Sequence, residues 1–129
     1  MFDRHKYNVS DPLHRTYKGR CYRSKAEMIR ASQLDLLKRC GEIKQWVYEP
    51  KFALGCPENI YIPDFQVELA DGTIIIEEVK GVETPMFKKN KRLWRVYGLY
   101  PLHILKAKSG KMHGWNRTVL LPEGATDAN

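Results

Sequence analysis

One short segment near the middle of the chain constrains the fold more than any other part of the sequence. Three consecutive isoleucines at 74–76 are followed closely by Glu77, Glu78 and Lys80. Such a run predicts a strand over 73–79 that is buried on both faces of a sheet. Ionised groups at the end of a buried strand are costly unless they are paired or bind a metal ion. Because side chains alternate along a strand, we expect Glu78 and Lys80 on one face and Glu77 on the other.

Signals on both sides of this segment predict two helices and further strands. Ser24 begins a capping box that opens a helix ending near Cys40, and Thr84, followed by Pro85, opens a second helix that ends at Gly98. The other expected strands cover residues 43–48 with an extension at 52–54, then 61–69, 102–106 and 115–121. This order predicts an α/β fold, with a mixed sheet of about four to five strands flanked by helices.

A length of 129 residues predicts one domain. We expect it to cover residues 23–121, after a basic arm at 1–22 and before a short tail at 122–129. The sequence has no apolar run of the roughly 18 residues that a membrane span needs, so no membrane partner is expected. The three cysteines lack CxxC spacing and are expected to be free thiols in a reducing compartment. With no apolar signal segment at the start, a cytoplasmic location is expected.

The net charge of +7 is distributed unevenly along the chain. Residues 1–25 carry a net charge of +5, residues 26–83 carry −5, and residues 84–111 carry +8 with no acidic residue. The basic excess favours a polyanionic partner, most simply nucleic acid, although a basic protein without such a partner is the alternative. A metal-dependent enzyme that acts on a phosphate backbone requires this distribution, because cations hold the phosphates and carboxylates hold the metal ion.

A hairpin turn decides whether a second acid can join Glu78. Asp64 lies in the strand expected before the turn, antiparallel to the strand that carries Glu78. A two-residue loop at 71–72 would direct the Asp64 side chain to the opposite face. A three-residue loop at 70–72, with Gly72 in the left-handed region, would place Asp64 directly across from Glu78, with Cβ atoms about 4.5–5.5 Å apart. A bulge elsewhere in the strand would have the same effect.

Two carboxylates at that distance repel each other unless a cation lies between them. Their hard oxygen ligands favour Mg²⁺, with Mn²⁺ as a substitute, over zinc. Such an ion can polarise a phosphate and lower the pKa of its bound water. Lys80 can orient the attacking water and offset charge that develops during the reaction. Glu27 would add a third carboxylate if the first helix packs on the strand face that carries Ile74 and Ile76.

These residues form a known pattern. Pro63-Asp64, thirteen intervening residues and Glu78-Val79-Lys80 match the PD-(D/E)xK motif, with Ser24-Lys25-Ala26-Glu27 on a preceding helix. Residues 20–106 therefore resemble the PD-(D/E)xK, or restriction-endonuclease-like, nuclease superfamily. Within it they look most like small phage nucleases such as the junction-resolving phage endonuclease I.

The resemblance implies roles for individual residues. Asp64, Glu78 and the backbone carbonyl of Val79 would be metal ligands, Lys80 the catalytic lysine and Glu27 the helix carboxylate. It also implies Mg²⁺-dependent phosphodiester hydrolysis, often by a homodimer, and a phage-like protein at work in a bacterial host cell.

Charge, paired carboxylates and resemblance together predict a metal-dependent DNA endonuclease that is selective for branched DNA or Holliday junctions, or that nicks. The alternative is a non-catalytic module that binds DNA or recognises DNA ends on the same scaffold. An RNA nuclease would share the same chemistry. The residues expected to contact phosphates are Arg20, Arg23, Lys25, Lys88, Lys89, Lys91, Arg92 and Arg95.

Each candidate also has a purely structural explanation. Glu27 could serve only as the acidic member of the capping box. Glu78 and Lys80 could form a salt bridge at a sheet edge, and Asp64 could cap a turn. The cations of the second helix could form a solvated face. Glu77 is expected at the surface or in support of the site rather than as a ligand.

Overall fold

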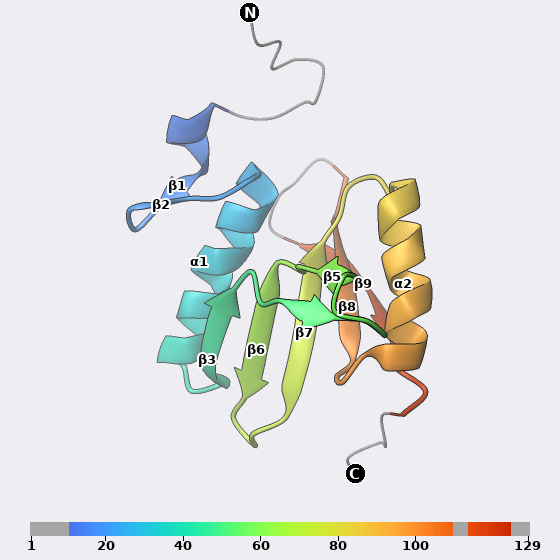
Figure 1. Ribbon diagram of the computed structural model, residues 1–129. Coiled ribbons are helices and arrows are strands. Elements are labelled where there is room, and N and C mark those ends of the chain that lie inside the picture. Colours follow the sequence, from blue (N-terminus) through green and yellow to red (C-terminus); the bar gives the residue numbers. More distant parts are fainter. Residues whose placement is uncertain (1–10, 110–113, 125–129) are drawn as a thin grey trace, which may run out of the picture.

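The structure, a computed structural model, describes residues 11–109 and 114–124. Within these residues two α-helices flank a five-stranded mixed sheet, which confirms the predicted α/β class (Figure 1). The helices are α1 (Lys25–Arg39) and α2 (Pro85–Tyr97). The strands of the sheet, in spatial order, are β3 (Ile43–Tyr48), β6 (Phe65–Leu69), β7 (Ile74–Val79), β8 (Leu102–Ala107) and β9 (Trp115–Leu120).

Two short hairpins lie outside this sheet. One joins β1 (Thr16–Tyr17) to β2 (Arg20–Cys21) after a 3₁₀ turn at Pro12–Arg15, and the other joins β4 (Phe52–Ala53) to β5 (Ile60–Tyr61). Tyr22, which follows the first hairpin, is only 2% exposed and belongs to the core. The described part of the basic N-terminal segment is therefore folded onto the domain.

The sheet is antiparallel except at its centre. β3, β6 and β7 form antiparallel pairs, β7 and β8 run parallel, and β9 is antiparallel to β8. Parallel neighbours need a crossover connection, and α2 supplies it between β7 and β8. The isoleucines Ile75 and Ile76 of β7 are buried on opposite faces, as predicted, because each belongs to a different one of the two apolar clusters beside the sheet.

Both helices begin and end where the sequence predicts. The Ser24 hydroxyl oxygen accepts the Glu27 N–H at the start of α1, and Thr84 Oγ1 accepts the Phe87 N–H at the start of α2, each at 3.1 Å. After α1 the chain turns through Gly41, whose φ of +80° is unstrained only for glycine.

The prediction of one continuous strand over 61–69 is wrong, because the strand is interrupted before β6. Pro63 has no N–H to donate to a ladder, and the chain before it leaves the sheet to pair with β4. The extension predicted at 52–54 is also wrong. Glu49 has a φ of +57°, and the residues beyond it form the separate β4–β5 hairpin instead of continuing β3.

The turn between β6 and β7 is the three-residue loop that the site hypothesis requires. Gly72 has a φ of +92° and donates its N–H to the Leu69 carbonyl at 2.9 Å. The register pairs Phe65 with Glu77. Asp64 therefore stands across from Glu78, one position further along.

The two helices cover opposite faces of the sheet (Figure 1). Ala31 and Leu34 of α1 pack with Phe65, Val67 and Ile75. On the other face α2 packs with Ile74 and Ile76 through its own buried residues, Phe87 and Trp94. Glu27 was expected to reach the site through packing of the first helix on the strand face that carries Ile74 and Ile76. This premise is wrong, since α1 packs on the opposite face.

Candidate active site

The four predicted catalytic residues line one cavity of about 290 Å³. Glu27 comes from the first turn of α1, Asp64 from the link before β6, and Glu78 and Lys80 from the end of β7. The remaining lining residues are Arg23, Tyr61, Ile62, Val79, Thr84, Met86, Phe87 and Asn90. Three carboxylates from three separate parts of the chain thus meet beside one lysine.

Glu78 is buried, with 6% of its surface exposed. Its Oε1 accepts a hydrogen bond of 2.6 Å from the Tyr61 hydroxyl, and its Oε2 lies 3.8 Å from Lys80 Nζ. Burial raises the pKa of the Glu78 carboxyl, while the Tyr61 hydroxyl and Lys80 oppose that rise. No arginine pairs with this carboxylate in the part of the chain that the structure describes.

Asp64 is equally buried, and its Oδ2 accepts the Val79 N–H at 2.6 Å. This bond ties the aspartate to the end of β7, where the register between the two strands brings it. Burial holds the pKa of the Asp64 carboxyl well above its usual range, and the charges of Glu78 and Glu27 add to that rise. The two carboxyls that the turn brings together are therefore destabilised in their charged forms.

Glu27 combines the helix start with a place in the cavity. Its backbone N–H is capped by Ser24, while its carboxylate accepts hydrogen bonds from the Tyr48 hydroxyl at 2.7 Å and the Ser24 hydroxyl at 3.3 Å. Burial raises the pKa of the Glu27 carboxyl, and both hydroxyls oppose the rise. Although α1 covers the other face, its first turn lies at the cavity, so the structural and the predicted catalytic explanations of Glu27 are compatible.

Lys80 is the cation beside Glu78, and its charge opposes the rise in the pKa of both Glu78 and Asp64. Its side chain is 25% exposed, and its Nζ lies 4.9 Å from the centre of the Phe87 ring. Arg23 also lines the cavity but forms an ion pair of 2.8 Å with Glu49. One lysine beside three carboxylates leaves a deficit of positive charge.

The donors in the cavity fit a hard divalent cation bound with few protein ligands. No group of three His, Cys, Asp or Glu side chains within residues 11–109 and 114–124 is arranged to hold a metal ion. The predicted set has two carboxylates, Asp64 and Glu78, and the Val79 carbonyl. Mg²⁺ commonly binds one or two carboxylates and keeps water or substrate phosphate for its other positions. Burial raises the pKa of both carboxyls, and a bound cation would offset this cost to their charged forms.

The predicted phosphate contacts fall into two groups. Lys88, Lys89, Arg92 and Arg95 are exposed on α2. Lys91 is different, because it pairs with Glu83 at 2.7 Å and is only 25% exposed. Near the start of α1, Lys25 and Arg23 are exposed, and the Arg20 guanidinium lies over the Tyr48 ring at 5.3 Å.

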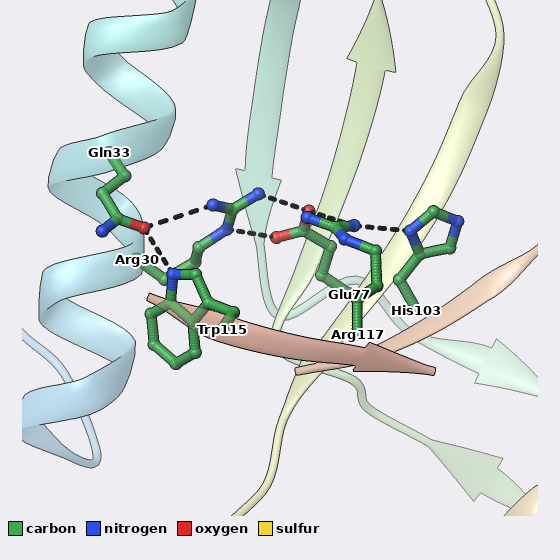
Figure 2. A network of polar contacts seen from close by, with 6 residues as sticks. All are labelled: Arg30, Gln33, Glu77, His103, Trp115 and Arg117. Atoms are coloured by element: carbon green, nitrogen blue, oxygen red, sulfur yellow. Dashed lines mark hydrogen bonds and ion pairs between the residues drawn. The ribbon is translucent and has the colours of Figure 1, made fainter. Parts of the chain in front are cut away.

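The partner of Glu77 escaped the sequence analysis. Glu77 lies on the α1 face of β7, fully buried, and receives two hydrogen bonds of 2.7 Å from Arg30 (Figure 2). Arg117 of β9 lies 3.5 Å away and also contacts His103. Arg30 stands three residues after Glu27 and next to Ala31, so a cation on the apolar face of the helix was the available signal. The tyrosines that bind Glu27 and Glu78 had no comparable signal, because they come from other strands.

Comparison with known proteins gives one family for the chain. None of the curated proteins matches the chain. None of the helices in the described part of the chain is long and apolar enough to cross a membrane. Residues 4–112 match DUF1064, a family described as a protein of unknown function. The match covers most of the chain and all four residues of the cavity that the sequence singled out, and the protein belongs to the DUF1064 family.

Proposed function

We propose that this protein is a Mg²⁺-dependent DNA endonuclease that hydrolyses phosphodiester bonds in the cavity at the end of β7, with Mn²⁺ as a substitute. The observation that carries the proposal is the pair Asp64 and Glu78, two buried carboxylates that face each other with no arginine partner among the described residues. A stable protein without such a function would neutralise buried carboxylates. The resemblance to PD-(D/E)xK nucleases supports the same conclusion.

The residues divide the work as their positions suggest. Asp64, Glu78 and the Val79 carbonyl would hold the cation, which supplies polarisation of the phosphate and activation of water when bound. Lys80 lies on the same face as Glu78 and can orient the attacking water and stabilise the charge that develops on the phosphate. Glu27 adds a third carboxylate at the edge of the cavity, where it can hold a proton or an ordered water.

The exposed cations of α2 offer a path for the DNA backbone. Four of them, Lys88, Lys89, Arg92 and Arg95, carry no ion pair recorded among the described residues, and α2 begins at the cavity with Thr84 and Met86. Phosphates that neutralise such a surface release counterions, so binding should weaken steeply with salt. A homodimer, which the resemblance implies, would present two such surfaces to two strands.

Two apolar side chains at the cavity favour DNA whose stacking is already interrupted. Ile62 is 40% exposed and Met86 is 63% exposed, and both line the cavity. Apolar side chains of this kind can insert between bases, and separating stacked bases costs a few kcal/mol per step, so insertion costs less where stacking is already interrupted. This supports the structure-selective form of the proposal.

The first test is nicking of supercoiled plasmid DNA in Mg²⁺. Replacing Glu78 with Gln or Lys80 with Ala should lower the rate by about 10²–10³-fold, because each removes a group that acts on the reacting phosphate. DNA binding, measured in Ca²⁺ by fluorescence anisotropy, should stay within about twofold of wild type. Glu68→Gln, which changes a carboxylate on β6 outside the cavity, is the matched control and should leave both measurements unchanged. Full cleavage by Glu78→Gln or Lys80→Ala would exclude these roles.

A substrate panel separates the remaining alternatives. Linear duplex, nicked duplex, a four-way junction and RNA are compared at equal concentration. Preference for nicked or branched DNA supports the proposal, whereas equal cleavage of linear duplex and junction contradicts structure selectivity. Salt-sensitive binding of DNA by the wild-type protein without cleavage in Mg²⁺ or Mn²⁺ would establish the non-catalytic module instead.

A further inference from the structure

Two tyrosines outside the predicted motif hold the carboxylates of the cavity. The Tyr61 hydroxyl donates to Glu78 Oε1 at 2.6 Å, and the Tyr48 hydroxyl donates to Glu27 Oε1 at 2.7 Å. We propose that Tyr61 and Tyr48 are positioning residues that orient these carboxylates toward a divalent cation. This inference rests on the proposed function of the cavity.

Each tyrosine lies on a different element from the carboxylate that it binds. Tyr61 belongs to β5 and Glu78 to β7, while Tyr48 belongs to β3 and Glu27 to α1. A glutamate carboxylate has three side-chain torsions, so its position is poorly defined until a partner fixes it. A hydrogen bond from a separate element fixes one oxygen and leaves the carboxylate in one orientation.

The tyrosine rings are themselves held by packing. Tyr61 is 4% exposed, and its ring meets the buried Trp94 ring edge-on at 5.8 Å. The Tyr48 ring packs against the rings of Phe65 and Tyr22, with 5.5 Å and 4.7 Å between ring centroids. A hydroxyl on an immobile ring is a donor in a constant place, and supporting hydrogen bonds of this kind strongly influence metal affinity.

The choice of a neutral donor matters for the charge of the cavity. A hydroxyl orients a carboxylate without cancelling its negative charge, whereas an arginine both orients and neutralises it. Arg30 has the second effect on Glu77, on the other face of β7 (Figure 2). Tyrosine partners therefore keep Glu78 and Glu27 available to attract a cation.

The test compares three substitutions that each delete one tyrosine–carboxylate bond of nearly the same length. Tyr61→Phe and Tyr48→Phe remove the bonds in the cavity, and Tyr17→Phe removes the bond of 2.7 Å to Asp35, which lies outside it. Affinity for Mn²⁺ and for Ca²⁺ is measured by titration calorimetry, and the unfolding midpoint in urea is measured for each protein. We expect about a tenfold loss of affinity for Tyr61→Phe, a similar or smaller loss for Tyr48→Phe, and no more than about a twofold change for Tyr17→Phe.

The outcomes separate this inference from the proposed function. Metal binding by the wild type with unchanged affinity in Tyr61→Phe and Tyr48→Phe would overturn the inference and leave the proposed function standing. An equal loss in Tyr17→Phe would also overturn it, because the effect would then follow general destabilisation. Absence of metal binding in the wild type would overturn both proposals. If Tyr61→Phe does not fold, Tyr48→Phe carries the comparison with Tyr17→Phe.

Discussion

Glu77 and Glu78 are neighbours on β7 with opposite electrostatic surroundings. Glu77 faces α1 and receives two hydrogen bonds from the Arg30 guanidinium, with Arg117 3.5 Å away (Figure 2). Glu78 faces the cavity and has the neutral Tyr61 hydroxyl, with Lys80 at 3.8 Å. Both carboxylates are almost completely buried. Glu77 is therefore paired with two arginines, whereas Glu78 has only a neutral hydroxyl and one lysine nearby.

This difference indicates what each face of the strand contributes. A buried carboxylate with two arginines fastens β7 to α1 and to β9, and its loss would leave the buried Arg30 without its carboxylate partner. A buried carboxylate without such partners lowers stability, and proteins keep such groups mainly at functional sites. The Arg30–Glu77 pair also joins the helix that carries Glu27 to the strand that carries Glu78. It therefore helps to hold these two carboxylates of the cavity in place.

The largest expected effect on stability comes from the face of β7 that carries Glu77. Glu77→Gln should lower the free energy of unfolding by about 3–5 kcal/mol, because it leaves Arg30 and Arg117 without their buried carboxylate. Urea denaturation followed by circular dichroism measures this change. The control is Glu68→Gln, which breaks a partly exposed pair with Lys44 and should cost about 0–1 kcal/mol. If Glu77→Gln lowers the free energy of unfolding no more than the control does, the proposed difference between the two faces of β7 is wrong.

The corresponding substitution at the next residue, Glu78→Gln, should change the free energy of unfolding in the opposite direction. In a metal-free buffer with chelator, Glu78→Gln should raise the free energy of unfolding by about 0.5–2 kcal/mol, since it removes a buried charge that Lys80, at 3.8 Å, offsets only in part. Saturating Mn²⁺ should stabilise the wild type, by about 2.7 kcal/mol at a hundredfold excess over the dissociation constant, and should stabilise Glu78→Gln much less. Destabilisation by Glu78→Gln comparable to that of Glu77→Gln would show that both glutamates serve the fold alone.

The smallest expected effect is a dependence of stability on pH. Burial raises the pKa of the Asp64, Glu27 and Glu78 carboxyls, so the folded protein retains protons that the unfolded chain releases. Without metal, the free energy of unfolding should therefore fall as the pH rises from the ordinary carboxyl range, about 4, toward neutral values. Urea denaturation across this range measures the slope, and Glu78→Gln should have a shallower slope than wild type. Identical slopes would contradict a raised pKa at Glu78.

Local signals in the sequence predicted most of the elements and one feature of the site. The caps at Ser24 and Thr84 and the turn at Gly72 depend on neighbouring residues, so their chemistry is readable without tertiary structure. The turn then determines the register that brings Asp64 opposite Glu78. The break in the strand at 62–64 was less clear, because Pro63 is compatible with either an edge strand or an interruption.

Contacts between distant elements were beyond the reach of the sequence. It did not indicate which face of the sheet α1 covers, because apolar residues line both faces of β7. The partners of the glutamates were hidden for the same reason, since Arg30 lies 47 residues from Glu77 and Tyr61 lies 17 residues from Glu78. No local preference connects residues so far apart.

The sequence by itself determined the order of the elements, the position of the hairpin turn but not its loop length, and the presence of two acids and a lysine near the end of a buried strand. Periodicity, caps and turn chemistry act over a few residues and can be read along the chain. The tertiary structure decided which carboxylate is paired with arginines and which has a neutral hydroxyl and one lysine as its neighbours. That outcome depends on which side chains from other elements reach each face of β7, and a charged group inside a protein is stabilised or destabilised by the neighbours that packing places around it.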